Sequence, residues 1–448
     1  MKKKLCILVL SLAFLLCSCS GNFANIQNVM QPPKLTGQET AMFSALQKSS
    51  GTNVTLRYPR SGEYRSAFLV CNLDDDGNNE GIVFYKPSDS DENSNVHVKI
   101  LSESNDKWNN IADIVGEGPE VDTISFGTAG GKKFVAIGYT LLNKNDKMLN
   151  LYHFNGKTLK QSFSINYSYF QICDLDSNGY DDIVSININS TSVSDNTTTF
   201  PPVSKYITWN PKTAENDEGF RVKNEVPLDI TVSEYKKIQV SNLSEDKKAL
   251  YLDGIKEKDV YSTEILSIEN GMLKNLIYNN VQNKTKATMR KSLTCTDINY
   301  DGILEIPRNS LLPGYEAKPE NERLNLTRWY SLQSGKFVEI ASSYFNSEDG
   351  YLFIFPNTWG NKVSVTYDKE LSETRFFAFN DSLTDTSQEI LKIKTVKRSD
   401  SNSIENDSQY EKICFNGQYV YYARMSNNTD EDLHVNLNKI AANLIPLN

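Results

Sequence analysis

The chain has 448 residues, with 47 Lys and Arg against 56 Asp and Glu and a formal net charge of −9. This acidic surplus argues against nucleic acid or an anionic lipid surface as partner, because phosphate contacts require clustered cations. It leaves carboxylates free to bind cations instead. The length exceeds that of one ordinary compact domain and favours either several domains or one unusually large one.

The N-terminal residues have the two parts of a secretory signal, a basic flank at residues 1–4 and an apolar run at residues 5–17 broken only by Ser11. The run is too short to span a membrane, which takes about 20 residues. It ends in the pattern of a bacterial lipobox, Leu16-Cys17-Ser18-Cys19. We expect residues 1–18 to be a lipoprotein signal peptide and Cys19 to be lipidated. An ordinary signal cut nearby is the alternative.

Residues 19–35, rich in Ser, Asn and Gln and containing the pair Pro32-Pro33, are expected to be a tether between lipid and domain. Removal of residues 1–18 takes away three lysines, which leaves 44 Lys and Arg against 56 acidic residues and a net charge of −12. No second apolar run approaches membrane length. The expected location is therefore the extracytoplasmic face of a cell membrane, with the N-terminal lipid as the anchor.

Residues 36–50 predict a short helical lead-in, because Thr36 and Glu39 have the spacing of a capping box. After Gly51 the sequence changes character. Short Tyr-, Phe-, Val- and Ile-rich runs alternate with Asn, Asp, Ser and Gly clusters almost to the end, which is typical of many short strands and turns. Residues 51–445 are therefore expected to form an all-β domain.

The all-β region contains an internal repeat of the form strand, acidic loop, strand, at residues 68–85, 169–186 and 292–307. Weaker copies without the acidic pattern lie at residues 124–139, 238–252, 351–366 and 412–423. Together they predict seven units of about 57 residues each, with six or eight left open. Most units carry a second hairpin, such as residues 152–157 and 330–336. Two hairpins make a four-stranded blade, so a seven-bladed β-propeller is expected.

Each acidic loop is numbered here from its first polar residue. Position 6 is Gly in all three loops, at Gly77, Gly179 and Gly302, and this permits a sharp turn. The side chains at positions 1, 3, 5 and 9 are candidate ligands. They are Asn72, Asp74, Asp76 and Glu80 in the first loop, Asp174, Asp176, Asn178 and Asp182 in the second, and Asp297, Asn299, Asp301 and Glu305 in the third. Position 7, at Asn78, Tyr180 and Ile303, offers its carbonyl oxygen. Hard oxygen ligands alternating around a required turn are typical of a calcium site.

Three carboxylates crowded into one loop repel each other unless a cation lies between them. We therefore expect about three structural Ca²⁺ ions, one for each loop. A helix-loop-helix calcium hand or a dockerin would need an acidic residue at position 12, which here is Val83, Ser185 or Arg308. The competing interpretation for any single loop is a solvated Asp/Asn turn.

Residues 71–85, 173–185 and 296–307 resemble the FG-GAP/VCBS repeats of integrin-α-like propellers. The lead-in at residues 56–66 is similar to uncharacterised VCBS-repeat lipoproteins of Firmicutes. The resemblance implies a seven-bladed propeller with Ca²⁺ inside blades 1, 3 and 5, and it implies no agreed activity. The other four units depart from the loop pattern, so no ligand is transferred to them.

No catalytic constellation is evident in the sequence. His97, His153 and His434 have no neighbour at zinc-ligand spacing, and Gly127–Lys132 is interpreted as a hairpin turn rather than a phosphate loop. The four cysteines Cys71, Cys173, Cys295 and Cys414 are expected to be small buried side chains rather than a disulfide framework. The sequence does not exclude a pair of carboxylates that cleaves a glycosidic bond, because the distance between two side chains in space is not visible in a sequence.

The leading hypothesis is a non-enzymatic envelope protein that binds a protein or a glycan. A carbohydrate-active enzyme, either a lyase or a hydrolase, is the first alternative. A component of an envelope assembly machine is the second. A cluster of acids and aromatics at the mouth of a channel would favour the enzyme, whereas a broad apolar patch would favour a protein partner.

Overall fold

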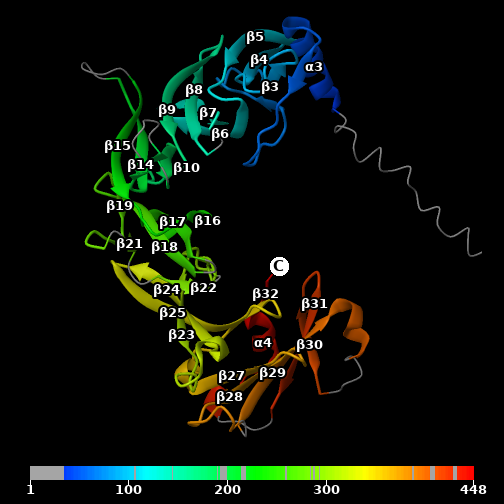
Figure 1. The fold of residues 1–448 in the computed structure, drawn as a ribbon, viewed down its shortest axis with the longest axis vertical. Coiled ribbons are helices and arrows are strands. Elements are labelled where there is room, and N and C mark those ends of the chain that lie inside the picture. Colours follow the sequence, from blue (N-terminus) through cyan, green and yellow to red (C-terminus); the bar gives the residue numbers. More distant parts are fainter. Residues whose placement is uncertain are drawn as a thin grey trace, which may run out of the picture. The chain divides into compact units, whose positions relative to one another are not determined.

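The computed structural model describes residues 35–104, 107–143, 145–188, 190–191, 199–212, 218–257, 260–282, 284–285, 288–291, 293–385, 388–403, 409–426 and 431–447. The expected signal peptide, the expected lipidation site Cys19 and almost all of the expected tether lie outside these residues. Within them the chain is all-β, with two α-helices, α3 (Gly37–Ser50) and α4 (Leu437–Asn443) (Figure 1). No helix in the described residues is long and apolar enough to cross a membrane.

Helix α3 begins at the predicted capping box. The backbone N–H of Glu39 donates to Thr36 Oγ1 over 3.2 Å, and the Thr36 N–H donates to Glu39 Oε2 over 2.8 Å. Two N–H groups that a helix start leaves without partners are thereby satisfied. Met42 and Leu46, one turn apart, are fully buried and pack against strands of the first sheet. The lead-in is therefore part of a core and not a free linker.

The described chain divides into two compact units. One consists of the residues up to Ser125 together with Ile137–Asn145 and Tyr152–Gln161. The other consists of Phe126–Ala136, Asp146–Leu151 and the residues from Ser162 onward. The first sheet lies in the former unit and has the order β1-β3-β4-β5, with β2 pairing with β3 beyond the end of β1. Its strands are β1 (Val54–Leu56), β2 (Phe68–Cys71), β3 (Glu80–Pro87), β4 (His97–Ser104) and β5 (Lys107–Val115).

Three further sheets follow in chain order. The second contains β6 (Glu120–Ala129), β7 (Lys132–Thr140), β8 (Lys147–Phe154) and β9 (Leu159–Asn166). The third contains β10 (Tyr169–Cys173), β11 (Asp182–Asn187), β14 (Val203–Asn210) and β15 (Gly219–Pro227). The fourth contains β16 (Glu234–Ser244), β17 (Lys247–Glu257), β18 (Val260–Glu269) and β19 (Met272–Asn275), with β22 (Arg290–Lys291) pairing with β18.

The fifth and sixth sheets complete the series. The fifth contains β23 (Ile306–Leu311), β24 (Asn325–Gln333), β25 (Lys336–Asn346) and β26 (Tyr351–Ile354), and β32 (Leu444–Pro446) pairs with β26. The sixth contains β27 (Val363–Asp368), β28 (Glu373–Ala378), β29 (Glu389–Lys397), β31 (Tyr419–Met425) and β30 (Glu411–Phe415) in that order. Two small ribbons also occur: β12 (Ser190–Thr191) with β13 (Thr199–Phe200), and β20 (Tyr278–Asn279) with β21 (Lys284–Thr285).

Six successive sheets, and not seven repeat units, are present in the described residues. Four of the expected unit starts lie in a strand near the beginning of a sheet. Residue 68 begins β2, residue 124 lies in β6, residue 169 begins β10 and residue 238 lies in β16. The starts expected near 351 and 411 are wrong. Residue 351 begins β26, the last hairpin strand of the fifth sheet, and β30 at Glu411 is the edge strand of the sixth. Alternating apolar patterns locate strands but do not show which strand opens a sheet.

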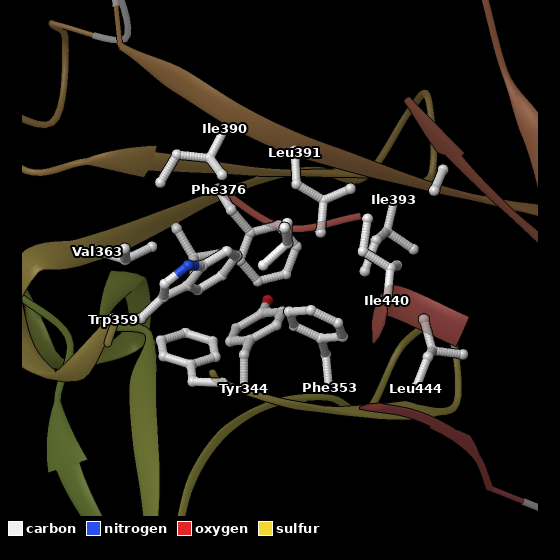
Figure 2. Close-up of a cluster of buried hydrophobic side chains, with 14 of the residues drawn as sticks. Tyr344, Phe353, Trp359, Val363, Phe376, Ile390, Leu391, Ile393, Ile440 and Leu444 are labelled. Carbon is white, nitrogen blue, oxygen red and sulfur yellow. The ribbon is translucent and has the colours of Figure 1, made fainter. Parts of the chain in front are cut away.

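The largest described core joins the fifth and sixth sheets with α4 (Figure 2). The rings of Phe353, Trp359 and Phe376 lie with centroids 5.1–5.9 Å apart, a spacing typical of favourable tilted and edge-on aromatic contacts. Trp359 is fully buried, and its indole N–H donates to the Leu433 carbonyl over 3.0 Å. The segment that leads to α4 is therefore fixed to this core by a polar contact as well as by packing.

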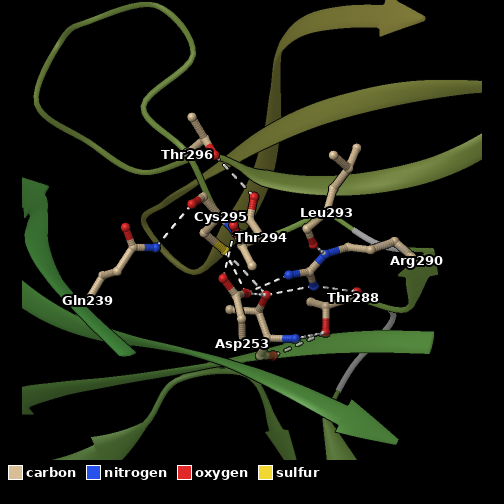
Figure 3. Close-up of polar contacts among 9 residues, drawn as sticks. Gln239, Asp253, Thr288, Arg290, Leu293, Thr294, Cys295 and Thr296 are labelled. Carbon is tan, nitrogen blue, oxygen red and sulfur yellow. Dashed lines mark hydrogen bonds and ion pairs between the residues drawn. The ribbon is translucent and has the colours of Figure 1, made fainter. Parts of the chain in front are cut away.

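A buried ion pair fastens the segment that follows β22 to the fourth sheet (Figure 3). The guanidinium of Arg290 contacts the carboxylate of Asp253 on β17, and both side chains are fully buried. The other Asp253 oxygen accepts the Cys295 N–H over 2.7 Å, and Arg290 Nε donates to the Leu293 carbonyl over 2.6 Å. The charges therefore neutralise each other while fixing the backbone at residues 293–295, immediately before the third acidic loop.

The Arg290→Met variant is expected to lose about 3–5 kcal/mol of unfolding free energy, because Asp253 would be left as a buried charge without its counter-ion. The measurement is the midpoint and slope of urea unfolding. Lys132→Met is the matched control, since the pair of Lys132 with Glu218 is about half exposed on both sides, and removal of such a pair costs about 1 kcal/mol or less. Similar losses in the two variants would contradict this account.

Candidate functional site

The three acidic loops occupy equivalent places in the first, third and fifth sheets. The first connects β2 with β3 and the second connects β10 with β11. The third lies between Thr296 and Glu305, which form an antiparallel bridge just before β23. The apolar residue at position 2 is buried in every loop, at Leu73, Leu175 and Ile298. Each loop is therefore a hairpin turn anchored by one apolar side chain.

The three loops share one backbone conformation. Position 6 is left-handed, with φ of 91° at Gly77, 89° at Gly179 and 85° at Gly302, as the sequence predicts. Open space surrounds a Cβ built at the first two of these glycines, so their backbone angle and not crowding requires Gly. Position 4 is also left-handed, with φ of 59–63° at Asp75, Ser177 and Tyr300. The sequence gives no signal for this second turn, because none of the three residues is Gly.

Side-chain oxygens at positions 1 and 5 accept backbone N–H groups from inside the loop. At position 5, the oxygens of Asp76, Asn178 and Asp301 accept the N–H of position 7 over 2.7–2.8 Å. At position 1, Asp174 accepts the Gly179 N–H over 3.0 Å and Asp297 accepts the Gly302 N–H over 2.9 Å. These bonds fix the side chains at positions 1 and 5 in the concave interior of the loop.

The acid at position 9 lies at the base of each loop and is almost completely buried, at 2% exposure for Glu80 and Asp182 and 0% for Glu305. One oxygen of Glu305 accepts the Ile298 N–H over 2.9 Å, whereas Oε1 is buried and has no hydrogen-bond partner. Asp182 Oδ2 is likewise buried without a partner. Burial of an unpaired carboxylate oxygen is costly, so each of these atoms indicates an absent positive or donating group.

The same burial shifts the pKa values of these acids. Desolvation, reinforced by the charges of Asp301 and Asp297, raises the pKa of Glu305 to about 7. Desolvation and the charge of Asp176 raise the pKa of Asp182 to about 6. The pKa of Glu80 is also raised, mainly by desolvation and then by Asp74 and Asp76. Each shift reflects the cost of placing a negative charge in a site with several others and no cation.

The first loop gathers its carboxylates most closely. Ligand oxygens of Asp74, Asp76 and Glu80 lie within 4.8 Å of one another. The second loop has a further polar neighbour in Tyr206 on β14, whose hydroxyl donates to Asp176 Oδ2 over 3.4 Å. That tyrosine is 30 residues from Asp176 in the sequence, and it reaches the loop because β14 pairs with β11.

These residues fit a hard divalent cation. Asn72, Asp74, Asp76 and Glu80 would hold it in the first loop, and the corresponding residues at positions 1, 3, 5 and 9 would do so in the second and third. The donors are all oxygens, which suits Ca²⁺. The bound ion would supply the positive charge that the buried position-9 acid lacks. A solvated turn explains the exposed carboxylates of each loop, but it does not explain the buried, unpartnered oxygens of Asp182 and Glu305.

A second charged group lies in the first sheet, apart from its loop. Asp113 on β5 accepts from His97 Nδ1 over 3.1 Å, from Lys99 over 2.8 Å and from the hydroxyl of Tyr85. The sequence alone does not show this acidic neighbour of His97, because the pairing crosses from β4 to β5. His434 follows the short helix at Glu431–Leu433, and His153 lies on β8. None of the three histidines belongs to a group of potential metal-binding side chains in the described residues.

None of Cys71, Cys173, Cys295 and Cys414 forms a disulfide in the described residues. Cys295 is fully buried, as predicted from the sequence, whereas Cys71, Cys173 and Cys414 are only partly buried, which differs from the prediction. Burial raises the pKa of Cys173 to about 12 and that of Cys414 to about 11, so both thiols stay protonated at neutral pH. They therefore have the properties of structural side chains rather than of nucleophiles.

Two of the larger cavities lie beside hairpin ends of the second unit. One, of about 820 Å³, is bordered by turns of the fourth and fifth sheets and by Ile303 of the third loop. The other, of about 560 Å³, is bordered by Pro201, Pro202 and Pro227 with Lys205 and Glu225. Both mix acidic, basic and apolar side chains, and neither gathers the aromatic and acidic residues expected of a glycoside-cleaving site.

No protein-family model matches the sequence, and no curated protein is significantly similar to it. Among solved structures, the exotype rhamnogalacturonan lyase YesX is 9% identical over 74% of this chain and 73% of its own, with a TM-score of 0.30. Sqt1 of Chaetomium thermophilum is 10% identical over 83% of this chain and 98% of its own, with a TM-score of 0.31. An exo-β-1,3-galactanase from Clostridium thermocellum is 11% identical over 80% of each chain, with a TM-score of 0.27. Likeness at this level gives no information on activity or ligand.

We expect Glu305→Gln to stabilise the protein when no divalent cation is present. The folded pKa of Glu305, about 7, lies above its ordinary value of 4.5, so the charged carboxylate costs stability that grows as the pH rises from about 4.5 to 7. Above pH 7 the glutamine variant should therefore melt at a higher temperature than wild type in EDTA, and it should melt no higher at pH 4.

The measurement is a thermal melt in EDTA at pH 4 and pH 8. Glu339→Gln is the matched control, because Glu339 lies partly exposed beside Arg328 and has no unpartnered buried oxygen. A lower melting temperature of Glu305→Gln at pH 8 in EDTA would contradict the interpretation of the orphan oxygen.

Proposed function

We propose that this chain is a calcium-stabilised β-sheet scaffold that works as a non-enzymatic binding module for a protein or a glycan on the outer side of a cell membrane. The observation that supports calcium most strongly is the repeated pairing of an oxygen-lined turn with a buried acid that lacks a partner. It occurs at Asp182 and Glu305, in loops 123 residues apart. Calcium is structural in this proposal, because the position-9 acids are inaccessible to a substrate.

The proposal includes closure of the six sheets into a β-propeller, with each sheet as one blade. Support comes from the sheets themselves, since each has four or five strands and most neighbouring strands follow one another in the chain. Ring closure removes long exposed edges, which such sheets otherwise leave open to aggregation. The membrane anchor in this proposal is the lipid on Cys19, supported by the lipobox pattern at residues 16–19.

Calcium is expected to raise the melting temperature by several degrees over EDTA. An ion that binds only the folded state stabilises it by RT ln(1 + [Ca²⁺]/Kd), which is about 1 kcal/mol per site at millimolar calcium if Kd is about 10⁻⁴–10⁻³ M. The calcium-induced rise in melting temperature should decrease more in Asp176→Ala and Asp301→Ala than in Asn72→Ala. The first two variants lose a charged ligand, whereas Asn72 is a neutral one. The measurement is a thermal melt in EDTA, excess Ca²⁺ and excess Mg²⁺. Identical curves in EDTA and calcium would sink the calcium proposal.

The Cys19→Ser variant should leave the membrane fraction and appear in the medium or in the soluble envelope fraction. The physical reason is that a diacylated cysteine holds the protein to the bilayer by burying its acyl chains, and serine cannot take its place in the lipobox. Cys414→Ser, a substitution far from the lipobox, is the control and should stay membrane-bound. Wild-type membrane levels of Cys19→Ser would show that the lipobox interpretation is wrong.

Small-angle scattering of the chain from residue 20 onward tests ring closure. A compact body of about 430 residues has a radius of gyration of about 22 Å. We expect a value near this one in excess calcium, together with a single compact distance distribution. A markedly larger radius with an elongated distribution would mean that the sheets form an open array and not a closed propeller.

A further inference from the structure

We propose that the second and third acidic loops are calcium-dependent clamps, each of which couples ion binding to the attachment of the sheet that precedes it in the chain. The inference depends on the calcium binding proposed above and adds a mechanical role to it. It concerns the loop residues at positions 6 to 8, whose side chains are not proposed ligands. All of the contacts described for these two loops lie within the second compact unit.

The second loop holds the end of β6 through residue 181, at position 8. The Asp181 N–H donates to the Thr128 carbonyl over 2.7 Å, and Asp181 Oδ2 accepts the Thr128 N–H over 2.8 Å. Residue 128 therefore has both of its backbone groups bonded to one residue of the loop. Apolar packing joins the same two sheets, since Ala129 and Phe134 share a core with Ile183 at the start of β11.

The third loop holds the end of β16 in an equivalent way. The Ser241 hydroxyl donates to the Gly302 carbonyl over 3.0 Å, and Asn242 forms a parallel backbone bridge with Ile303. Leu304, at position 8, packs into the core of the fourth sheet with Ala249 and Tyr251. In both cases the loop of one sheet contacts the first strand of the previous sheet, at a weaker copy of the repeat.

The contacts arise from positions 6, 7 and 8, which lie between the ligands at positions 5 and 9. An ion that fixes Asn178 and Asp182 also fixes the three residues between them, and the same holds for Asp301 and Glu305. Without the ion, the buried position-9 acid has an unpartnered oxygen and is destabilising where it stands. Movement of that acid toward water would displace the residues that hold the preceding sheet.

The first loop provides an internal comparison. Its position-8 residue, Asn79, pairs with Glu103 on β4 of the same sheet, by a side-chain bond of 3.2 Å and a backbone bond of 3.0 Å. Ion binding there should therefore strengthen its own sheet. The clamp role is restricted to the second and third loops.

Hydrogen exchange of the full chain, followed by mass spectrometry with and without calcium, tests the proposal. Calcium should slow exchange in residues 126–136 and 238–244, both of which precede the loops and contain no proposed ligand. A coupling of ordinary size would slow exchange by about 5- to 150-fold. Asp182→Asn should abolish the effect at residues 126–136 only, and Glu305→Gln should abolish it at residues 238–244 only. Glu80→Gln should leave both effects intact.

Asp181→Ala and Ser241→Ala separate the clamp from the ion site, because neither residue is a proposed ligand. Each should still bind calcium in a titration, yet lose the calcium-dependent protection of the preceding strand. Protection confined to residues 174–182 and 297–305, with calcium bound, would overturn the clamp and leave the calcium proposal standing. Absence of calcium binding in wild type would overturn both. Ser233→Ala is the control for loss of a hydroxyl, since Ser233 bonds only within the fourth sheet, to the Ile255 carbonyl.

Discussion

A carboxylate that is taken out of water needs a positive partner, and this requirement governs the most informative parts of the molecule. Asp253 meets it within the protein, because Arg290 lies against it and both side chains are fully buried. Asp182 and Glu305 are buried to the same degree, yet each keeps an oxygen without a partner. The difference between a buried acid with an internal counter-ion and one without distinguishes a structural ion pair from a candidate ion site.

The requirement also explains why the loops recur with so little variation. Left-handed residues at positions 4 and 6 point successive N–H groups inward, where they orient the side chains at positions 1 and 5. The apolar residue at position 2 then fixes the loop to a core, as Leu175 does between the third and fourth sheets. The position-9 acid thus lies where strand and turn meet, and a cation bound there contacts both. In our proposal, such a cation would link the stability of the hairpin to that of the neighbouring sheet in the second and third loops.

Much of this arrangement could be predicted from the sequence, because turn chemistry is local. The glycines at position 6, the capping box at Thr36 and the turn at Gly130 and Gly131 each depend on a few adjacent residues, and the structure confirms them. The number of sheets could not be predicted, since β26 and β30 have the apolar alternation of an opening strand but pair as closing ones. Contacts such as Asp113 with His97, or Asp181 with Thr128, depend on strand register or on the docking of one sheet against another. Those relationships are absent from any local pattern.

The position of β32 bears on how the chain acquires its structure during synthesis. Strands of the third and fourth sheets follow one another closely, so each sheet can assemble as soon as its own segment leaves the ribosome. The fifth sheet differs, because Leu352 of β26 pairs with Ile445, which emerges 93 residues later, after the whole sixth sheet. Until then the free edge of β26 is exposed to chaperones and proteases. Premature termination anywhere after β26 would leave that edge open, and quality control could recognise an incomplete chain by this one strand.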